Sequence, residues 1–207
     1  LTEASDPHMM KNSEWGAVAY LSQNATYGKG SEVEKNGNSS YLTGGGDYKT
    51  NTAQSTTNNV TGVYDMSGGA NEYVAAYINN GHDNLTTYGE SLINSVNAGN
   101  TKYADVYKVT SDSQSNNYNN AQPTQGQGTP TKDTGHYGDT VWETSNNYSS
   151  MNSWYGDYSR FPFTNYPFFN RGGRYDNRAA SVGVFCFNYN TGDPISGHSF
   201  RVVVPVL

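Results

Sequence analysis

An aromatic segment in the second half of the chain places the strongest constraint on the fold. Residues 139–169 hold ten aromatic side chains, while Gly156, Pro162 and Pro167 interrupt any long helix there. The whole chain is only 34% hydrophobic but 14% aromatic. Because large rings bury much area per residue, we expect a folded protein with an aromatic core rather than a disordered chain. The rings left outside that core are candidates for a binding surface.

Periodicity and turn residues predict an α+β protein with short strands, two or more helices and long irregular loops. Apolar residues recur at helical spacing over 7–22, and an apolar, β-rich strand is predicted over 73–78. Residues 89–109 predict a short helix, a break, and a second short helix or strand. Residues 110–136 are almost entirely Ser, Asn, Gln, Thr, Gly and Pro, which predicts a surface insertion that contributes nothing to a core. The length suits one domain over 1–207.

Charge is distributed unevenly along the chain. The net charge is −6, but residues 1–150 carry −8 and residues 151–207 carry +2, and every Arg lies at or after Arg160. The overall acidity disfavours a nucleic-acid partner, and no apolar run is long enough for membrane insertion. Arg suits forked recognition of ligands, which favours a binding role for the C-terminal region. For Arg171 and Arg201 a structural role is the preferred alternative.

Few residues are arranged for catalysis or for a cofactor. The chain has one cysteine, Cys186, and four scattered histidines. A disulfide framework and a Cys-based zinc site within one chain are therefore excluded, and no nucleophile–base pair is recognisable. We expect no enzyme activity and no cofactor. Asp65, Asn71 and Glu72 flank the turn at 67–69 and could hold calcium, although such residues more often cap the turn backbone.

The run from Arg174 to His198 has a restricted alphabet. Its 25 residues include no Lys, Glu, Gln, Met or Trp, although these types fill 27 of the 207 positions. At that frequency, a run of this length would lack all five by chance roughly 3% of the time. The run is followed by a strand-like closure over 199–207. A tight turn, Arg171-Gly172-Gly173, precedes it.

Two motifs in the chain resemble those of formylglycine-generating-enzyme-like proteins. DMSGGANEYV at 65–74 is similar to a "DM.GNVWEW" segment of that family. RGG at 171–173 with SFRVV at 199–203 resembles its "RGGSW … GFR" ending. The resemblance implies a C-type lectin fold of the sulfatase-modifying-factor-like variant, in which N- and C-terminal segments pair.

The enzyme's chemistry is not supported by the residues present. That oxidation uses a pair of active-site cysteines with copper, whereas this chain has Cys186 alone. Gly69-Ala70 stands where Asn-Val is usual, and Tyr73 where Trp is usual. The "EPN", "QPD" and "WND" motifs of calcium-dependent sugar-binding lectins are also missing from the sequence.

The C-terminal run also resembles the variable region of diversity-generating retroelement proteins, which use the same fold. In that family a reverse transcriptase randomises adenines in Asn-type template codons. Such codons can become Arg, Tyr, Asp, Thr, Ile, His, Cys, Ser or Gly, but not the five missing types. The resemblance implies a variable region at 174–198, with Phe185, Phe187 and Phe200 as invariant scaffold. The implied ligand-binding residues are Arg174, Tyr175, Asp176, Arg178, Cys186, Tyr189, Thr191, Asp193, Ile195 and His198, with Trp154 and Tyr155 as a rim.

The resulting prediction is a binding protein displayed outside the cell, on a bacterial surface or a phage particle. Its partner would be a protein or glycan on a target surface, and its specificity would change as residues 174–198 are rewritten. Cys186 could equally be a small buried apolar residue. Three alternatives remain open: an ordinary loop at 174–198 in an Asn-rich protein, an invariant adhesive or structural domain, and an oxidase with different chemistry. The sequence makes no prediction of oligomeric state.

Overall fold

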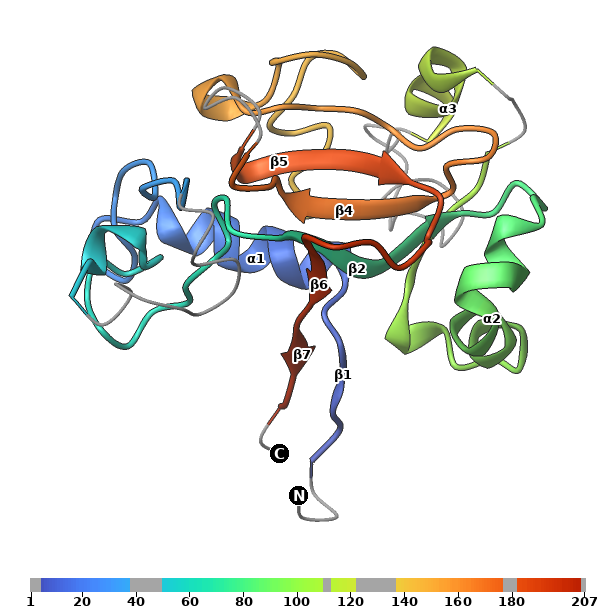
Figure 1. Ribbon diagram of the computed structural model, residues 1–207, viewed down its shortest axis with the longest axis horizontal. Coiled ribbons are helices and arrows are strands. Elements are labelled where there is room, and N and C mark those ends of the chain that lie inside the picture. Colours follow the sequence, from blue (N-terminus) through green and yellow to red (C-terminus); the bar gives the residue numbers. More distant parts are fainter. Residues whose placement is uncertain (1–4, 38–49, 110–112, 122–136, 177–181, 206–207) are drawn as a thin grey trace.

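The computed structural model describes residues 5–37, 50–109, 113–121, 137–176 and 182–205, and it confirms an α+β fold (Figure 1). The helices are α1 (Asn12–Ser22), α2 (Asn84–Asn97) and α3 (Gln114–Asn120), and the 3₁₀ turns are η2 (Thr52–Gln54), η3 (Thr101–Tyr103) and η4 (Trp154–Gly156). The strands are β1 (His8–Met9), β2 (Asn71–Ile78), β3 (Asp105–Tyr107), β4 (Phe168–Gly172), β5 (Gly183–Asn190), β6 (His198–Phe200) and β7 (Val202–Val203).

Strand β2 is the centre of the main sheet, which confirms the strand predicted over 73–78. The sheet runs in the order β3-β2-β4-β5, with β4 antiparallel to both of its neighbours. Strands β3 and β6 both pair with β2 in parallel, β3 along residues 76–78 and β6 along residues 71–73. They therefore lie end to end along one edge of β2. Seven of the eight β2 residues are buried, as expected for a strand enclosed on both faces.

A short ribbon joins the two ends of the described chain. In β1 and β7, His8 pairs with Val203 and Met9 with Val202 in antiparallel register. The Met10 N–H extends this pairing by donating to the Arg201 carbonyl at 3.0 Å. Figure 1 shows the ribbon extending from the body below β6. The predicted pairing of N- and C-terminal segments is confirmed.

Aromatic rings form the main core, as the sequence predicts. Tyr107 packs against Phe169 with ring centroids 4.9 Å apart, and Phe161 meets both rings edge-on. Trp15 of α1 is fully buried, and its indole N–H donates to the Val184 carbonyl at 2.7 Å. This hydrogen bond satisfies the one polar atom of the ring and fixes α1 against β5.

Helix boundaries differ from the predictions where long-range contacts intervene. Helix α1 begins at Asn12 and not at residue 7, because residues 8–9 pair with β7 as a strand. The Glu14 carboxylate accepts from the Lys11 N–H at 2.9 Å and caps the helix start. Helix α2 begins at Asn84, five residues before the predicted segment at 89–109, and η3 and β3 follow its end.

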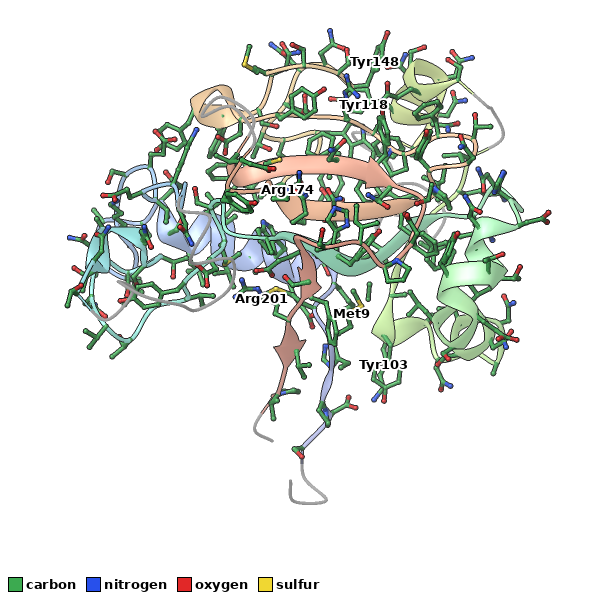
Figure 2. All side chains as sticks on the ribbon, viewed as in Figure 1. Met9, Tyr103, Tyr118, Tyr148, Arg174 and Arg201 are labelled. Carbon is green, nitrogen blue, oxygen red and sulfur yellow. The ribbon has the colours of Figure 1, made fainter. Side chains whose placement is uncertain are left out.

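The prediction that 110–136 adds nothing to the core is wrong for its described part. Helix α3 lies within that range, and its Tyr118 is buried against Trp142 and Phe161, with ring centroids 5.9 Å from each. The hydroxyl of Tyr118 donates to the Ser145 carbonyl at 3.1 Å. Figure 2 shows Tyr118 and Tyr148 on the α3 side of the sheet. Tyr118 and the buried Asn117, which donates to the Pro162 carbonyl at 3.3 Å, attach this polar helix to the core. Residues 110–112 and 122–136 lie outside the described part.

Candidate ligand-binding groove

The three motifs that carry the family resemblance meet in space. The N–H of Gly68 donates to the Gly172 carbonyl at 3.0 Å, which joins the turn at 67–69 to the end of β4. Gly172 and Gly173 have φ values of +79° and +75°, a backbone conformation that glycine adopts without strain, so the predicted turn follows β4 directly. Tyr175 is partly exposed, and its backbone N–H donates to the Gly69 carbonyl at 2.9 Å.

The third motif is fixed by a charge pair. Both oxygens of Glu72 in β2 accept hydrogen bonds from the Arg201 guanidinium, and Arg201 also donates to the Tyr64 carbonyl at 3.2 Å. The guanidinium stands 5.6 Å from the Trp15 ring centroid. Burial raises the pKa of Glu72, and the adjacent Arg201 opposes that shift. Figure 2 shows Arg201 where the β1–β7 ribbon meets the body.

Arg171 is a second cation bonded within the fold, which confirms that both of these arginines are structural. It is fully buried in β4, 5.8 Å from the ring centroids of both Trp15 and Phe187. It donates to the Thr140 hydroxyl. Burial lowers the pKa of Arg171, and the neighbouring Asp139 carboxylate counteracts this. Arg171 is inaccessible to a ligand, and the partly exposed Arg201 has its guanidinium engaged by Glu72 and Tyr64.

Strand β5 places buried residues inside the predicted variable region. Phe185 and Phe187 are fully buried, as predicted for scaffold residues, whereas Phe200 is 63% exposed and is not buried scaffold. Cys186 is also buried, at 2% exposure, so its prediction as a ligand-binding residue is wrong. Burial raises the pKa of its thiol to about 12, which leaves it protonated and unreactive.

Arg174 forms a second ion pair, with Asp176, and also links the segments before and after β5 through the Ser196 carbonyl. The guanidinium of Arg174 contacts both oxygens of Asp176, at 2.5 and 2.7 Å, and its Nη1 lies 3.4 Å from the Ser196 carbonyl. Gly197 approaches Arg174 so closely that a Cβ there would lie 2.6 Å from the Arg174 Cδ. The segment after β4 therefore packs against the segment before β6, and both contribute predicted site residues. Figure 2 shows Arg174 beside β4 and β5.

The predicted site residues nearest β6 surround a groove of about 390 Å³. Its lining consists of Tyr73, Gly192, Pro194, Ile195, His198, Ser199 and Phe200. The side chain of Ile195 is 44% exposed, and the His198 ring meets Tyr73 edge-on with centroids 5.2 Å apart. His198 Nε2 lies 3.1 Å from the Asn71 amide nitrogen. Burial, with help from Arg174, lowers the pKa of His198 and favours a neutral imidazole that accepts from Asn71.

The loop that forms the groove is held by Tyr73. Its hydroxyl donates to the Asn190 side chain at 2.5 Å and lies 3.0 Å from the Asp193 carbonyl. Within the loop, the Thr191 hydroxyl bonds to the Asp193 carboxylate. Thr191 and Asp193 thus lie beside the groove but mainly shape the loop. From the sequence, Tyr73 was predicted only as part of a strand and as a departure from a motif, and Asn71 only as a possible calcium ligand, so neither was predicted as a residue of the ligand-binding surface.

Tyr189 and the predicted rim lie in other clusters. The Tyr189 hydroxyl accepts from Arg160 at 2.7 Å, and its ring packs on Phe163 and Tyr166 with centroids 5.0 and 4.8 Å away. Trp154 and Tyr155 are 45% and 49% exposed and pack over the buried Phe185, not around the groove. The predicted single face is therefore divided among the groove and two aromatic clusters. Arg178 lies outside the described residues.

The three residues considered for calcium have separate partners. Glu72 is paired with Arg201, Asp65 accepts from the Asn36 amide at 3.1 Å, and Asn71 contacts His198. In the described part of the chain, no three His, Cys, Asp or Glu side chains gather in a metal-binding arrangement. Over the same residues, no helix has the length and apolarity to cross a bilayer.

Comparisons of the chain with protein-family models, with curated proteins and with solved structures gave no match.

Proposed function

We propose that this protein is a ligand-binding domain whose recognition surface is the groove together with the Arg174–Asp176 pair. The observation that carries the proposal is that exposed apolar side chains lie beside a cavity on a framework of fixed residues. Tyr73, Phe187 and Arg171 are tied into the sheet, whereas Ile195 and Phe200 expose 44% and 63% of their surface beside an open cavity. Exposed apolar side chains around a polar-rimmed cavity are characteristic of binding sites.

The surface is suited to changes in sequence. Arg174, Asp176 and Ile195 lie in connecting segments, so their replacement leaves the β2–β4–β5 ladder and its buried rings unchanged. A rigid scaffold also lowers the entropy cost of binding, because few groups need to be ordered. These features support a region at 174–198 rewritten by a retroelement, with specificity altered and the fold kept. Cys186 would then be a buried core position that lies inside the variable region.

The meeting of the 65–74, 171–173 and 199–203 motifs supports a C-type lectin fold of the sulfatase-modifying-factor-like variant. In this proposal the domain is displayed on a bacterial surface or a phage particle and binds a protein or glycan of a target. Its activity is binding and not catalysis, since the cysteine-pair oxidation has only one buried thiol, Cys186. An invariant adhesin is the second candidate, favoured by the contacts of Tyr189 with Arg160, Phe163 and Tyr166, which give this residue a structural role.

Two experiments test the proposal. Sequencing this locus from many cells of one population should reveal differences clustered at 174–198 with 199–207 unchanged. Uniform sequences would refute diversification and favour the invariant adhesin. A protein and glycan array should identify a ligand for the purified domain. Ile195→Asp should then weaken that ligand at least about tenfold, because a buried apolar contact is lost. The matched control Val60→Asp changes another exposed aliphatic residue, 69% exposed and outside the groove, and should bind normally.

A further inference from the structure

A second cavity, of about 400 Å³, opens between α2 and β2 and adjoins the groove. We refer to it as the α2 pocket. It is lined by Met9, Tyr73, Val74, Thr87, Tyr88, Gly89, Glu90, Ser91, Leu92, Phe168, Gly192 and Phe200. Tyr73, Gly192 and Phe200 also line the groove, so one ligand can occupy both cavities. Figure 1 shows α2 beside the end of β2.

Two glycines of the lining allow close packing around Phe168. Gly89 has non-helical backbone angles, φ −124° and ψ 19°, and a Cβ there would lie 2.7 Å from the Phe168 ring. Gly192 has φ +101°, and a Cβ there would lie 2.6 Å from the same ring and 2.8 Å from the Tyr88 Cβ. The helix bend and the loop therefore depend on one another, and the cavity is formed by packed elements of the fold.

The chemistry of the lining selects a particular class of group. Four aromatic residues contribute to it: Tyr73, Tyr88, Phe168 and Phe200. Among the lining residues that the structure describes, Glu90, exposed on α2, is the one charged residue, and none is Lys or Arg. Cations are attracted both to ring faces and to a carboxylate. An apolar body that ends in a positive charge therefore complements the pocket.

We propose that the α2 pocket receives a basic side chain, Lys or Arg, from a protein ligand bound at the groove. This proposal rests on the proposed function, which supplies the ligand. The alkyl stem lies along Phe168 and Leu92, and the charged end reaches Glu90 at the rim. The lining also holds the hydroxyls of Tyr73, Thr87, Tyr88 and Ser91, so Glu90 is the group that distinguishes a cationic side chain from a neutral glycan or a purely apolar residue. Either of these neutral ligands would leave the Glu90 carboxylate without a cationic partner.

The test uses Nα-acetyl-lysine methylamide, which keeps its side-chain ammonium, as the probe. Nα-acetyl-norleucine methylamide is its neutral analogue. Titration of the isotope-labelled protein, followed by NMR, should give saturable shifts with the lysine probe and weaker binding of norleucine. Ser91→Trp should abolish binding by filling the pocket, whereas Asn94→Trp, an exposed position on α2 outside the lining, should not. Glu90→Gln should weaken the lysine probe about three- to fivefold, as for a partly exposed ion pair, and leave norleucine unchanged.

Equal binding of the two probes, or an unchanged affinity in Glu90→Gln, would overturn the selection for a cation. Absence of saturable shifts, or binding that survives Ser91→Trp, would overturn the pocket itself. The Ile195→Asp variant separates this proposal from the proposed function. If that variant still loses the array-selected ligand while the lysine probe fails, only the α2 pocket is refuted. If Ile195→Asp binds the array-selected ligand normally while the lysine probe behaves as expected, the groove is refuted as the recognition surface and the pocket stands.

Discussion

Removal of Arg201 should destabilise the protein through Glu72. The Glu72 side chain is 4% exposed and both of its oxygens are bonded to Arg201, which is itself 21% exposed. Arg201→Met keeps most of the apolar stem but leaves a buried carboxylate without its cation. Breaking a fully buried pair costs about 3–5 kcal/mol, and partial exposure of Arg201 lowers our expectation to about 2–4 kcal/mol. Urea unfolding, with the slope m compared between variants, measures this loss.

A double variant and the pH dependence show whether the unpaired charge is the cause. Adding Glu72→Met to Arg201→Met should recover part of the lost stability, because no buried charge remains. Without Arg201 the pKa of Glu72 rises further, so native Glu72 binds its proton at higher pH than unfolded Glu72. The deficit of Arg201→Met should therefore shrink as the pH falls. A loss below about 1 kcal/mol, additive effects in the double variant, or a deficit independent of pH would each refute the reasoning.

Three further outcomes are expected. Burial raises the pKa of Asp157 from 3.8 to about 7, so the stability gained from its protonation is present in full below pH 3.8 and is lost as the pH rises to about 7. Asp157→Asn should remove this pH dependence from the free energy of unfolding measured across that window. Gly192→Ala should cost at least about 1 kcal/mol, because its φ is +101° and Phe168 occupies the space for a Cβ; unchanged thermal unfolding would contradict this. The Cys186 thiol should resist iodoacetamide in the native protein and react in urea, and rapid native alkylation would disprove its burial.

The boundary of the candidate surface could not be read from the amino-acid alphabet alone. Lys, Glu, Gln, Met and Trp are missing not only from 174–198 but from every position between Tyr155 and Leu207. The groove was set by contacts between distant segments, such as Arg174 with Ser196 and Asn71 with His198. Those contacts join residues up to 127 positions apart, a separation that no local pattern encodes.

The sequence by itself determined the properties that follow from local composition. These are the α+β class, the aromatic core, the strand that became β2, and the structural use of Arg171 and Arg201. Side-chain alternation along a strand and the high burial of large rings are sufficient reasons for them.

Only the tertiary structure decided which of the remaining residues face solvent. Cys186 is buried and Phe200 exposed although both lie in or beside one uniform run, and Tyr189 is drawn away from the groove by Arg160. Gly16 has a low propensity for the helix that contains it, but it is required because the Gly138 carbonyl oxygen would lie 2.0 Å from any Cβ there. In each case the outcome depends on whether another segment covers the position, and that is a property of the packed chain as a whole.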